Sequence, residues 1–140
     1  MKLIVLVITL AAGSTPALAS DDISESCTGT ETVQVGVQQP MTVPYSIYFS
    51  ADLANRSYCY DKCTEAQTYP ISDGGSNPIK LAELKTSVQT RRLVYDRDRS
   101  VLTDYQIITT GPIRIERNAS ANCKAAKFTE PWSLSTSRPK

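Results

Sequence analysis

The four cysteines are the residues whose types and spacing point most directly to chemistry. Cys59 and Cys63 lie four positions apart, while Cys27 and Cys123 each stand alone in the sequence. A zinc site needs clustered Cys or His ligands, and this chain has no histidine. A thioredoxin-type redox pair needs CxxC in a βαβ setting, which the sequence does not offer. We therefore expect two disulfides, no metal and no cofactor.

The favoured pairing is Cys27 with Cys123 and Cys59 with Cys63. Residues four apart in an extended strand are separated by roughly 13 Å, which is too far for a disulfide. If Cys59 and Cys63 pair, the chain must therefore leave the strand between them, and Asp61 is a turn former that permits this. Spacing alone cannot fix the connectivity, so 27–59 with 63–123 and the crossed version stay open.

The missing histidine also removes the commonest catalytic groups. A Ser-His-Asp triad and a Cys-His dyad are excluded, and no nucleotide-phosphate loop motif occurs. Three aspartates lie close together in the sequence, Asp96, Asp98 and Asp104. Arg97 and Arg99 alternate with the first two. We expect these carboxylates to belong to a solvated hairpin with weak ion pairs, not to a catalytic pair across a cleft. The sequence thus predicts a protein that is not an enzyme.

Arginines gather in one part of the chain, with six of the eight between residues 91 and 117. On neighbouring antiparallel strands several would share one face and form a basic patch for an acidic partner, a carboxylate or a phosphate group. The other interpretation is the ordinary polar face of a sheet, because carboxylates lie among them. The candidate binding patch comprises Arg91, Arg92, Arg97, Arg99, Arg114 and Arg117. The seven tyrosines are either half-buried strand residues, which we favour, or a recognition surface.

The start of the chain has the pattern of a signal peptide in residues 1–19. Lys2 precedes an apolar stretch that is too short to span a bilayer, and Ala17-Leu18-Ala19 carries the small residues of a cleavage site. Cleavage would leave 14 basic and 14 acidic residues. A domain without net charge has no long-range field to collect nucleic acid or anionic lipid. We expect a periplasmic or secreted protein that binds no nucleic acid and has no membrane span.

The segments that must position these residues have the period of β-strands. Apolar and polar residues alternate in residues 31–38 and 42–53, and residues 88–95 and 101–109 predict a hairpin. Val43, Tyr45, Ile47 and Phe49 share one face, and Pro44 indicates an edge or strand-entry position. Residues 20–30 are polar, and the chain is expected to be irregular up to Cys27. Ile113 and Ile115 are expected to point inward.

These strands predict an all-β fold, a small antiparallel meander closed as a barrel or folded as a sandwich, with two disulfides. Pairing the first strand with the last would remove free sheet edges and bring Cys27 near Cys123. Residues 20–132 are expected to form a single domain, followed by a disordered tail at 133–140, and we expect a monomer. Trp132 is expected to cap the bottom of the barrel.

The function most consistent with this sequence is non-enzymatic binding of a protein or a cell-envelope component. The alternatives are a small-ligand carrier that uses the barrel interior, which needs an apolar cavity, or an inhibitor of a lysozyme or protease. Small exported β-barrels with one or two disulfides include such inhibitors, and this chain has the same broad build.

Overall fold

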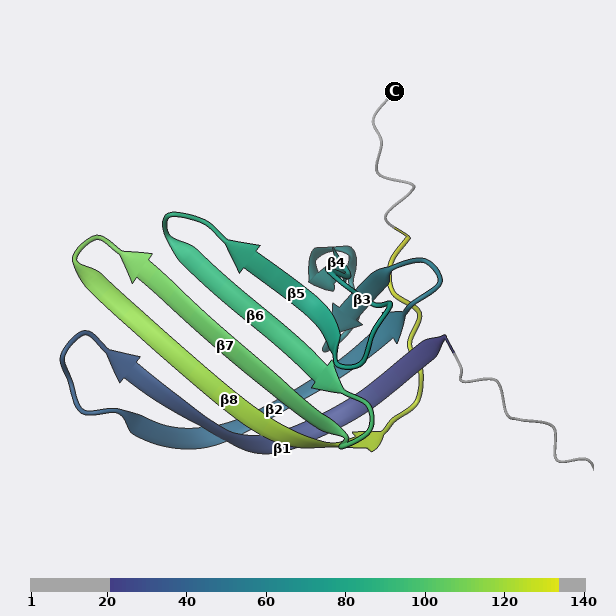
Figure 1. The fold of residues 1–140 in the computed structure, drawn as a ribbon, viewed down its shortest axis with the longest axis horizontal. Helices are drawn as coiled ribbons and strands as arrows, with labels where there is room; N and C mark the ends of the chain where they lie inside the picture. The colour runs from purple at the N-terminus through teal and green to yellow at the C-terminus, as the bar shows by residue number, and fades with distance from the viewer. Residues whose placement is uncertain (1–20, 134–140) are drawn as a thin grey trace, which may run out of the picture.

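The computed structural model describes residues 21–133, and within them eight antiparallel strands form one sheet (Figure 1). The predicted signal peptide and all but the first residue of the predicted tail lie outside the described residues. The strands are β1 (Asp22–Val35), β2 (Met41–Asp52), β3 (Ser57–Tyr60), β4 (Thr68–Pro70), β5 (Ile79–Lys85), β6 (Gln89–Asp96), β7 (Val101–Thr110) and β8 (Ile113–Ala125). Between β3 and β4 lies a single 3-10 turn, Glu65–Gln67. No helix in this part of the chain has the length and apolar character needed to cross a membrane.

The sheet is a meander that almost closes on itself as a barrel. Its strand order is β4-β3-β2-β1-β8-β7-β6-β5. Every strand therefore pairs with its neighbours in sequence except β4 and β5, which lie at the two ends of this order, and β1 pairs with β8. Only the step from β4 to β5 lacks a regular ladder. There, Asp73 and Lys80 exchange two backbone hydrogen bonds of 2.9 and 2.8 Å. The predicted all-β fold and the pairing of first and last strands are confirmed.

Both expected disulfides are present. Cys27 and Cys123 lie directly opposite each other on β1 and β8, and their sulfurs are bonded. The Cys59–Cys63 bond joins β3 to the turn that follows it. As the spacing required, the chain leaves the strand after Tyr60, and Asp61 and Cys63 adopt positive φ angles of 55° and 54°. The alternative pairings are thereby excluded.

The first strand is longer than the sequence pattern predicts. The chain was expected to be irregular up to Cys27, and this expectation is wrong from Asp22 onward. The segment is polar because β1 turns one face to solvent, where Ser26, Thr28 and Thr30 are exposed, while Ile23 and Cys27 are buried on the other face. Ladders to β2 on one side and β8 on the other hold it extended.

The apolar core fills one end of the barrel, which we call the base. This is the end where β1 and β7 begin and β2, β6 and β8 finish (Figure 1). Phe49 packs edge to face against Tyr95, with ring centroids 5.2 Å apart. Each large side chain buried there stabilises the fold by about 1.5–3 kcal/mol. The core includes Ile23, Cys27, Phe49, Ala51, Tyr58, Ile79, Leu81, Leu93, Tyr95, Leu102, Ala121 and Cys123.

The opposite end, which we call the rim, carries the β1–β2, β5–β6 and β7–β8 turns (Figure 1). Here the barrel wall is incomplete, because β3 and β4 have only four and three residues. β3 pairs with β2 only over Phe49–Asp52, so the first half of β2 is a sheet edge. Pro44 lies in this half, where its missing N–H weakens the edge as a template for another strand. The prediction of an edge position for Pro44 is confirmed.

The sheet bends where β1 meets β8 (Figure 1), and the residues there are small. Gly29 pairs with Ala121, and Glu31 pairs with Ala119. A Cβ at Gly29 would lie 2.0 Å from the Ser120 carbonyl oxygen and 2.7 Å from the Ala121 Cα. Glycine inside a strand is typical of such bends, and here it permits the close backbone approach.

Removing the Cys27–Cys123 bond is expected to destabilise the protein more than removing Cys59–Cys63. The first bond spans 96 residues and the second spans four. In the chain-entropy model, the alanine double variants should lose roughly 4–5 and roughly 2 kcal/mol of unfolding free energy, respectively. Urea denaturation of the two double variants measures the difference, and equal losses would contradict this account.

Gly29→Ala is expected to lower the unfolding free energy by roughly 3 kcal/mol, because the added methyl group meets backbone that cannot move aside. Gly36→Ala is the control. It lies in a turn with φ +56° and meets no atom within 4 Å, so it should lose only about 1 kcal/mol from backbone strain. Thermal melting of both variants measures the two losses of stability. A Gly29→Ala protein as stable as Gly36→Ala would contradict the close backbone approach at Gly29.

Candidate functional site

The incomplete wall exposes the concave face of the barrel between β2 and β5, and we call this region the trough. It contains two hollows of about 430 and 350 Å³. Tyr45, Tyr60, Asp104, Gln106 and Arg117 are among the residues lining the first. Tyr58, Tyr69, Leu84, Gln89 and Arg91 are among those lining the second. Arg91 is bound to Asp104, so the hollows lie on either side of one ion pair.

The centre of the trough is a buried carboxylate with four donors around it. The Asp104 side chain is 4% exposed and accepts hydrogen bonds from Arg91 Nη2 at 3.1 Å, the Tyr45 hydroxyl at 3.1 Å and Gln106 Nε2 at 3.1 Å. Arg91 Nε adds a longer contact of 3.4 Å. A buried carboxylate is tolerated only when paired and hydrogen-bonded, and this one is both.

A second ion pair lies beside the first. Arg117 Nη2 on β8 donates to Glu31 Oε2 on β1 at 2.8 Å, with the Glu31 side chain 6% exposed and that of Arg117 41% exposed. The sheet register explains how the two pairs meet. Ala119 is the partner of both Asp104 and Glu31, and Gln106 is the partner of Arg117. The four charges therefore cancel within one small area of the wall.

Tyrosine rings form one side of the trough. The rings of Tyr60 and Tyr69 are stacked, with centroids 5.8 Å apart and planes 6° apart, and their hydroxyls lie 3.5 Å from each other. Tyr58 lies beneath them, with its ring 5.8 Å from that of Tyr69. Tyr69 is 39% exposed, whereas Tyr58 is buried. An aromatic face and several hydroxyls are thus open to the trough.

The environment keeps these groups in fixed ionisation states. Burial, followed by the Asp104 carboxylate, raises the pKa of the Tyr45 phenol far above its usual range, so that Tyr45 remains a donor. Burial raises the pKa of Tyr58 to about 12. Burial opposes the charge on Arg91, but Asp104 outweighs it and raises the pKa of the guanidinium. Tyr45, Tyr58 and Arg91 therefore do not titrate near neutral pH.

The structure does not bring the six candidate arginines together on one face. Arg91 and Arg117 point into the trough and are paired with buried carboxylates. Arg92 and Arg114 alternate with them and lie on the convex face, where Arg114 pairs with Glu116 at 2.9 Å. Arg97 and Arg99 lie in the β6–β7 turn at the base, where Arg99 pairs with Asp96 at 2.6 Å. A single basic patch is not formed.

The three clustered aspartates also separate. Asp96 lies at the end of β6 and Asp98 in the turn after it, and the guanidinium of Arg99 lowers the pKa of Asp96. Asp104, expected on the same solvated hairpin, is instead buried in the trough. Asp104 is buried because it shares the inward face of β7 with Leu102. Strand alternation predicts an apolar residue at such a position, and this strand has an aspartate there. Glu31 and Gln106 were missed for the same reason. Tyr45 was placed on the face that it shares with Phe49, but its contact with Asp104 was not predicted.

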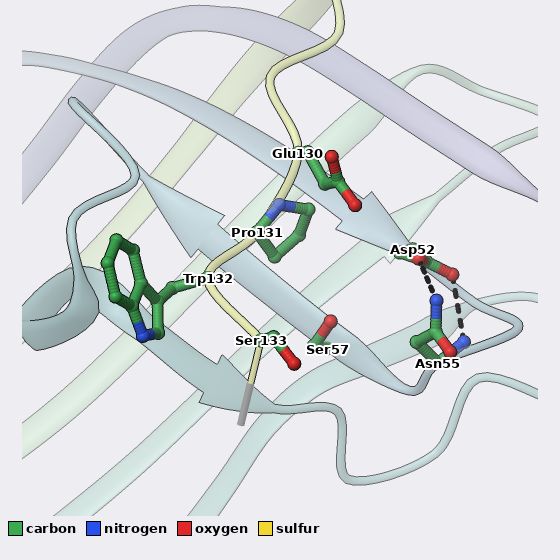
Figure 2. A pocket seen from close by; sticks show the side chains of 7 residues that line it. All are labelled: Asp52, Asn55, Ser57, Glu130, Pro131, Trp132 and Ser133. Atoms are coloured by element: carbon green, nitrogen blue, oxygen red, sulfur yellow. Dashed lines mark hydrogen bonds between the residues drawn. The ribbon is translucent and has the colours of Figure 1, made fainter. Parts of the chain in front are cut away.

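A further hollow of about 200 Å³ lies on the outer side of β3, beneath the C-terminal segment (Figure 2). Figure 2 shows this segment crossing the strands, with Trp132 on one side of it and Ser57 and Asn55 on the other. Backbone N–H groups of Thr129 and Trp132 donate to the side chains of Ser50 and Thr68, each at 3.2 Å. Trp132 is 50% exposed and lies against the outer wall, so the expectation that it caps the bottom of the barrel is wrong.

No protein-family model matches this chain, and no curated protein is significantly similar to it. The two disulfides are compatible with an exported protein. The function must otherwise be inferred from the trough itself.

Asp104→Ala is expected to lower the unfolding free energy by about 3 kcal/mol, because it leaves the largely buried Arg91 without its counter-charge. Replacing both members, Arg91→Leu with Asp104→Leu, should recover most of that loss. Urea denaturation of the two single variants and of the double variant completes a double-mutant cycle. If the double variant were as unstable as Asp104→Ala, the cost would not come from an unpaired charge.

Proposed function

We propose that this chain is a periplasmic or secreted, non-enzymatic binding domain that holds an uncharged, hydroxyl-rich ligand in the trough. The ligand class that fits is a glycan of a cell-envelope component. The observation that carries the proposal is the wall of the trough, which is charge-balanced and hydrogen-bonded. This wall lies in an open concave face, beside the half-buried ring of Tyr60 and the exposed ring of Tyr69. The disulfides support an exported location.

The charge balance favours an uncharged ligand. Arg91 is neutralised by Asp104 and Arg117 by Glu31, so the wall holds no excess charge to attract a phosphate or a free carboxylate. It still offers donors and acceptors, because guanidinium and amide N–H groups, carboxylate oxygens and phenol hydroxyls lie side by side. A sugar hydroxyl both donates and accepts, and it suits such a mixed wall.

The tyrosines supply the apolar part of the recognition. Tyr60 and Tyr69 present stacked rings at the open side, and an aromatic face contacts the C–H face of a sugar ring while the phenol bonds its hydroxyls. Rings locked by stacking lose little conformational freedom when a ligand arrives. The trough is therefore preorganised for an extended ligand that lies across both hollows.

The carboxylates of the trough support binding in preference to glycan cleavage. Hydrolysis of a glycosidic bond needs one carboxyl group that holds a proton and a second that can attack or activate water. Asp104 accepts from Arg91, Tyr45 and Gln106, and Glu31 accepts from Arg117. Both carboxylates are thus already engaged in ion pairs with arginines. The carrier alternative is not favoured, because side chains fill the base of the barrel.

The test is a titration of the ¹⁵N-labelled protein with soluble oligosaccharides, a tetramer of N-acetylglucosamine and one of glucose. We expect amide shifts at Tyr60, Tyr69 and Gln106 and a roughly millimolar Kd, which is typical of a few exposed hydrogen bonds and one ring contact. Tyr60→Ala with Gln106→Ala should weaken binding at least about tenfold.

Thr103→Ala is the matched control, because Thr103 neighbours Asp104 on β7 but is exposed on the convex face. It should leave the affinity unchanged. Two results would overturn the proposal: no shift in the trough with either oligosaccharide, or an equal loss of affinity in the control. A partner that is a protein would give the first of these results.

A further inference from the structure

Large apolar side chains are exposed at the rim. Among the residues that the structure describes, seven large hydrophobic side chains are exposed, and five of them lie at this end of the barrel. They are Val37 (103% exposed), Met41 (59%), Val88 (57%), Ile113 (50%) and Leu84 (43%). Exposed apolar side chains that cluster in this way mark an interaction surface.

The three rim turns are held together, so their apolar residues form one surface. The Gly36 N–H of the β1–β2 turn donates to the Arg114 carbonyl at 2.7 Å, beside Ile113. The Thr109 N–H, at the end of β7, donates to the Val88 carbonyl of the β5–β6 turn at 2.8 Å. Figure 1 shows the three hairpins projecting side by side at the same end of the sheet. We call residues 35–41, 84–89 and 109–114 the rim tips.

The charges of the rim tips have one sign. Lys85 and Arg114 are their only charged residues, and the tips contain no aspartate or glutamate. Arg114 contacts Glu116, which lies two residues further down β8, and its side chain is 58% exposed. The base, in contrast, carries charges of both signs: Arg97 and Arg99 lie in the β6–β7 turn, together with several carboxylates there and at the ends of β1, β2 and β6. These carboxylates are Asp21, Asp22, Asp52, Asp96 and Asp98.

We propose that the rim tips dock on an anionic lipid surface. Apolar side chains on the tips of separate hairpins can each enter the boundary between headgroups and acyl chains, while Lys85 and Arg114 lie at the level of lipid phosphates. The carboxylates at the base point away from such a surface. Because the chain has almost no net charge, there is no long-range attraction, and the apolar tips supply most of the binding.

A second copy of the chain fits the rim less well. Two rims facing each other would bring Lys85 and Arg114 against the same cations of the other copy, with no acidic residue in the tips to pair with them. A lipid surface also needs no matching pockets for tips that project separately. Leu84 and Gln89 of the rim tips also line the second hollow of the trough. The inference is tested separately from the trough, because no residue of the rim tips belongs to the two ion pairs and the residues altered below line neither hollow.

The test is co-sedimentation of the full exported chain with vesicles of phosphatidylcholine, with and without one third phosphatidylglycerol. We expect binding to the anionic vesicles that high salt weakens only in part. Val37→Asp with Val88→Asp should weaken it at least about tenfold, because two inserted apolar groups are replaced by charges that anionic lipid repels. Lys85→Gln with Arg114→Gln should weaken it less and should remove the preference for anionic vesicles.

Thr28→Asp with Thr103→Asp is the control, because it adds the same charges to the exposed convex face. It should bind anionic vesicles like the unaltered chain, apart from a small loss due to net charge. Failure of the unaltered chain to sediment with anionic vesicles would overturn the proposal, as would equal losses in the two aspartate variants. A concentration-dependent dimer that Val37→Asp with Val88→Asp abolishes would assign the rim to a second copy instead.

Discussion

The pairing of β1 with β8 is the contact on which the rest of the structure depends. Strands β1 to β4 and strands β5 to β8 are each a simple meander, and neither closes without the other. The ladder between β1 and β8 joins them, and the Cys27–Cys123 bond fixes the register at one pair of residues. Because Gly29, Ala119 and Ala121 are small, the two strands approach closely at the same place, and the sheet bends there toward closure.

The trough exists because the strands of this nearly closed sheet differ in length. β1, β2, β7 and β8 have 10 to 14 residues, whereas β3 and β4 have four and three. The long strands therefore continue toward the rim beyond the point where the opposite wall stops. Their inward faces change from apolar near Leu102 to polar at Asp104 and Glu31 at the height where the wall ends. An apolar face there would have been an exposed patch, so the change of residue type matches the geometry.

The sequence allowed the fold class, the hairpin of residues 88–109 and the inward face of β2 to be predicted, because each rests on a local period. The pairing of the cysteines was only a preference, because spacing left two other connectivities open, and the structure decides among them. The site was not predictable in the same way. The carboxylates of Asp104 and Glu31 stand at inward positions, where the alternating pattern predicts apolar residues. Each pairs with an arginine on another strand, Asp104 with Arg91 and Glu31 with Arg117. Arg117 and Glu31 are 86 residues apart. Only the register between β1 and β8, which no local pattern contains, places them together. The start of β1 was missed because Glu25 and Gly29 interrupt its inward face beside Ile23 and Cys27, so apolar and polar residues do not alternate there.

Ion pairs on the concave wall are better explained by recognition than by stability. Pairs of this kind contribute little net stability compared with apolar side chains of similar volume, because both charges lose their hydration. A barrel selected for stability alone would have apolar residues at Asp104 and Arg91, as it does at the next inward positions of the same strands, Leu102 and Leu93. Instead, Tyr45 and Gln106 also donate to Asp104, which leaves a rigid polar surface where the wall is open. The same side chains would be redundant in a closed barrel, so the missing wall and the polar network are most simply understood as two parts of one binding site.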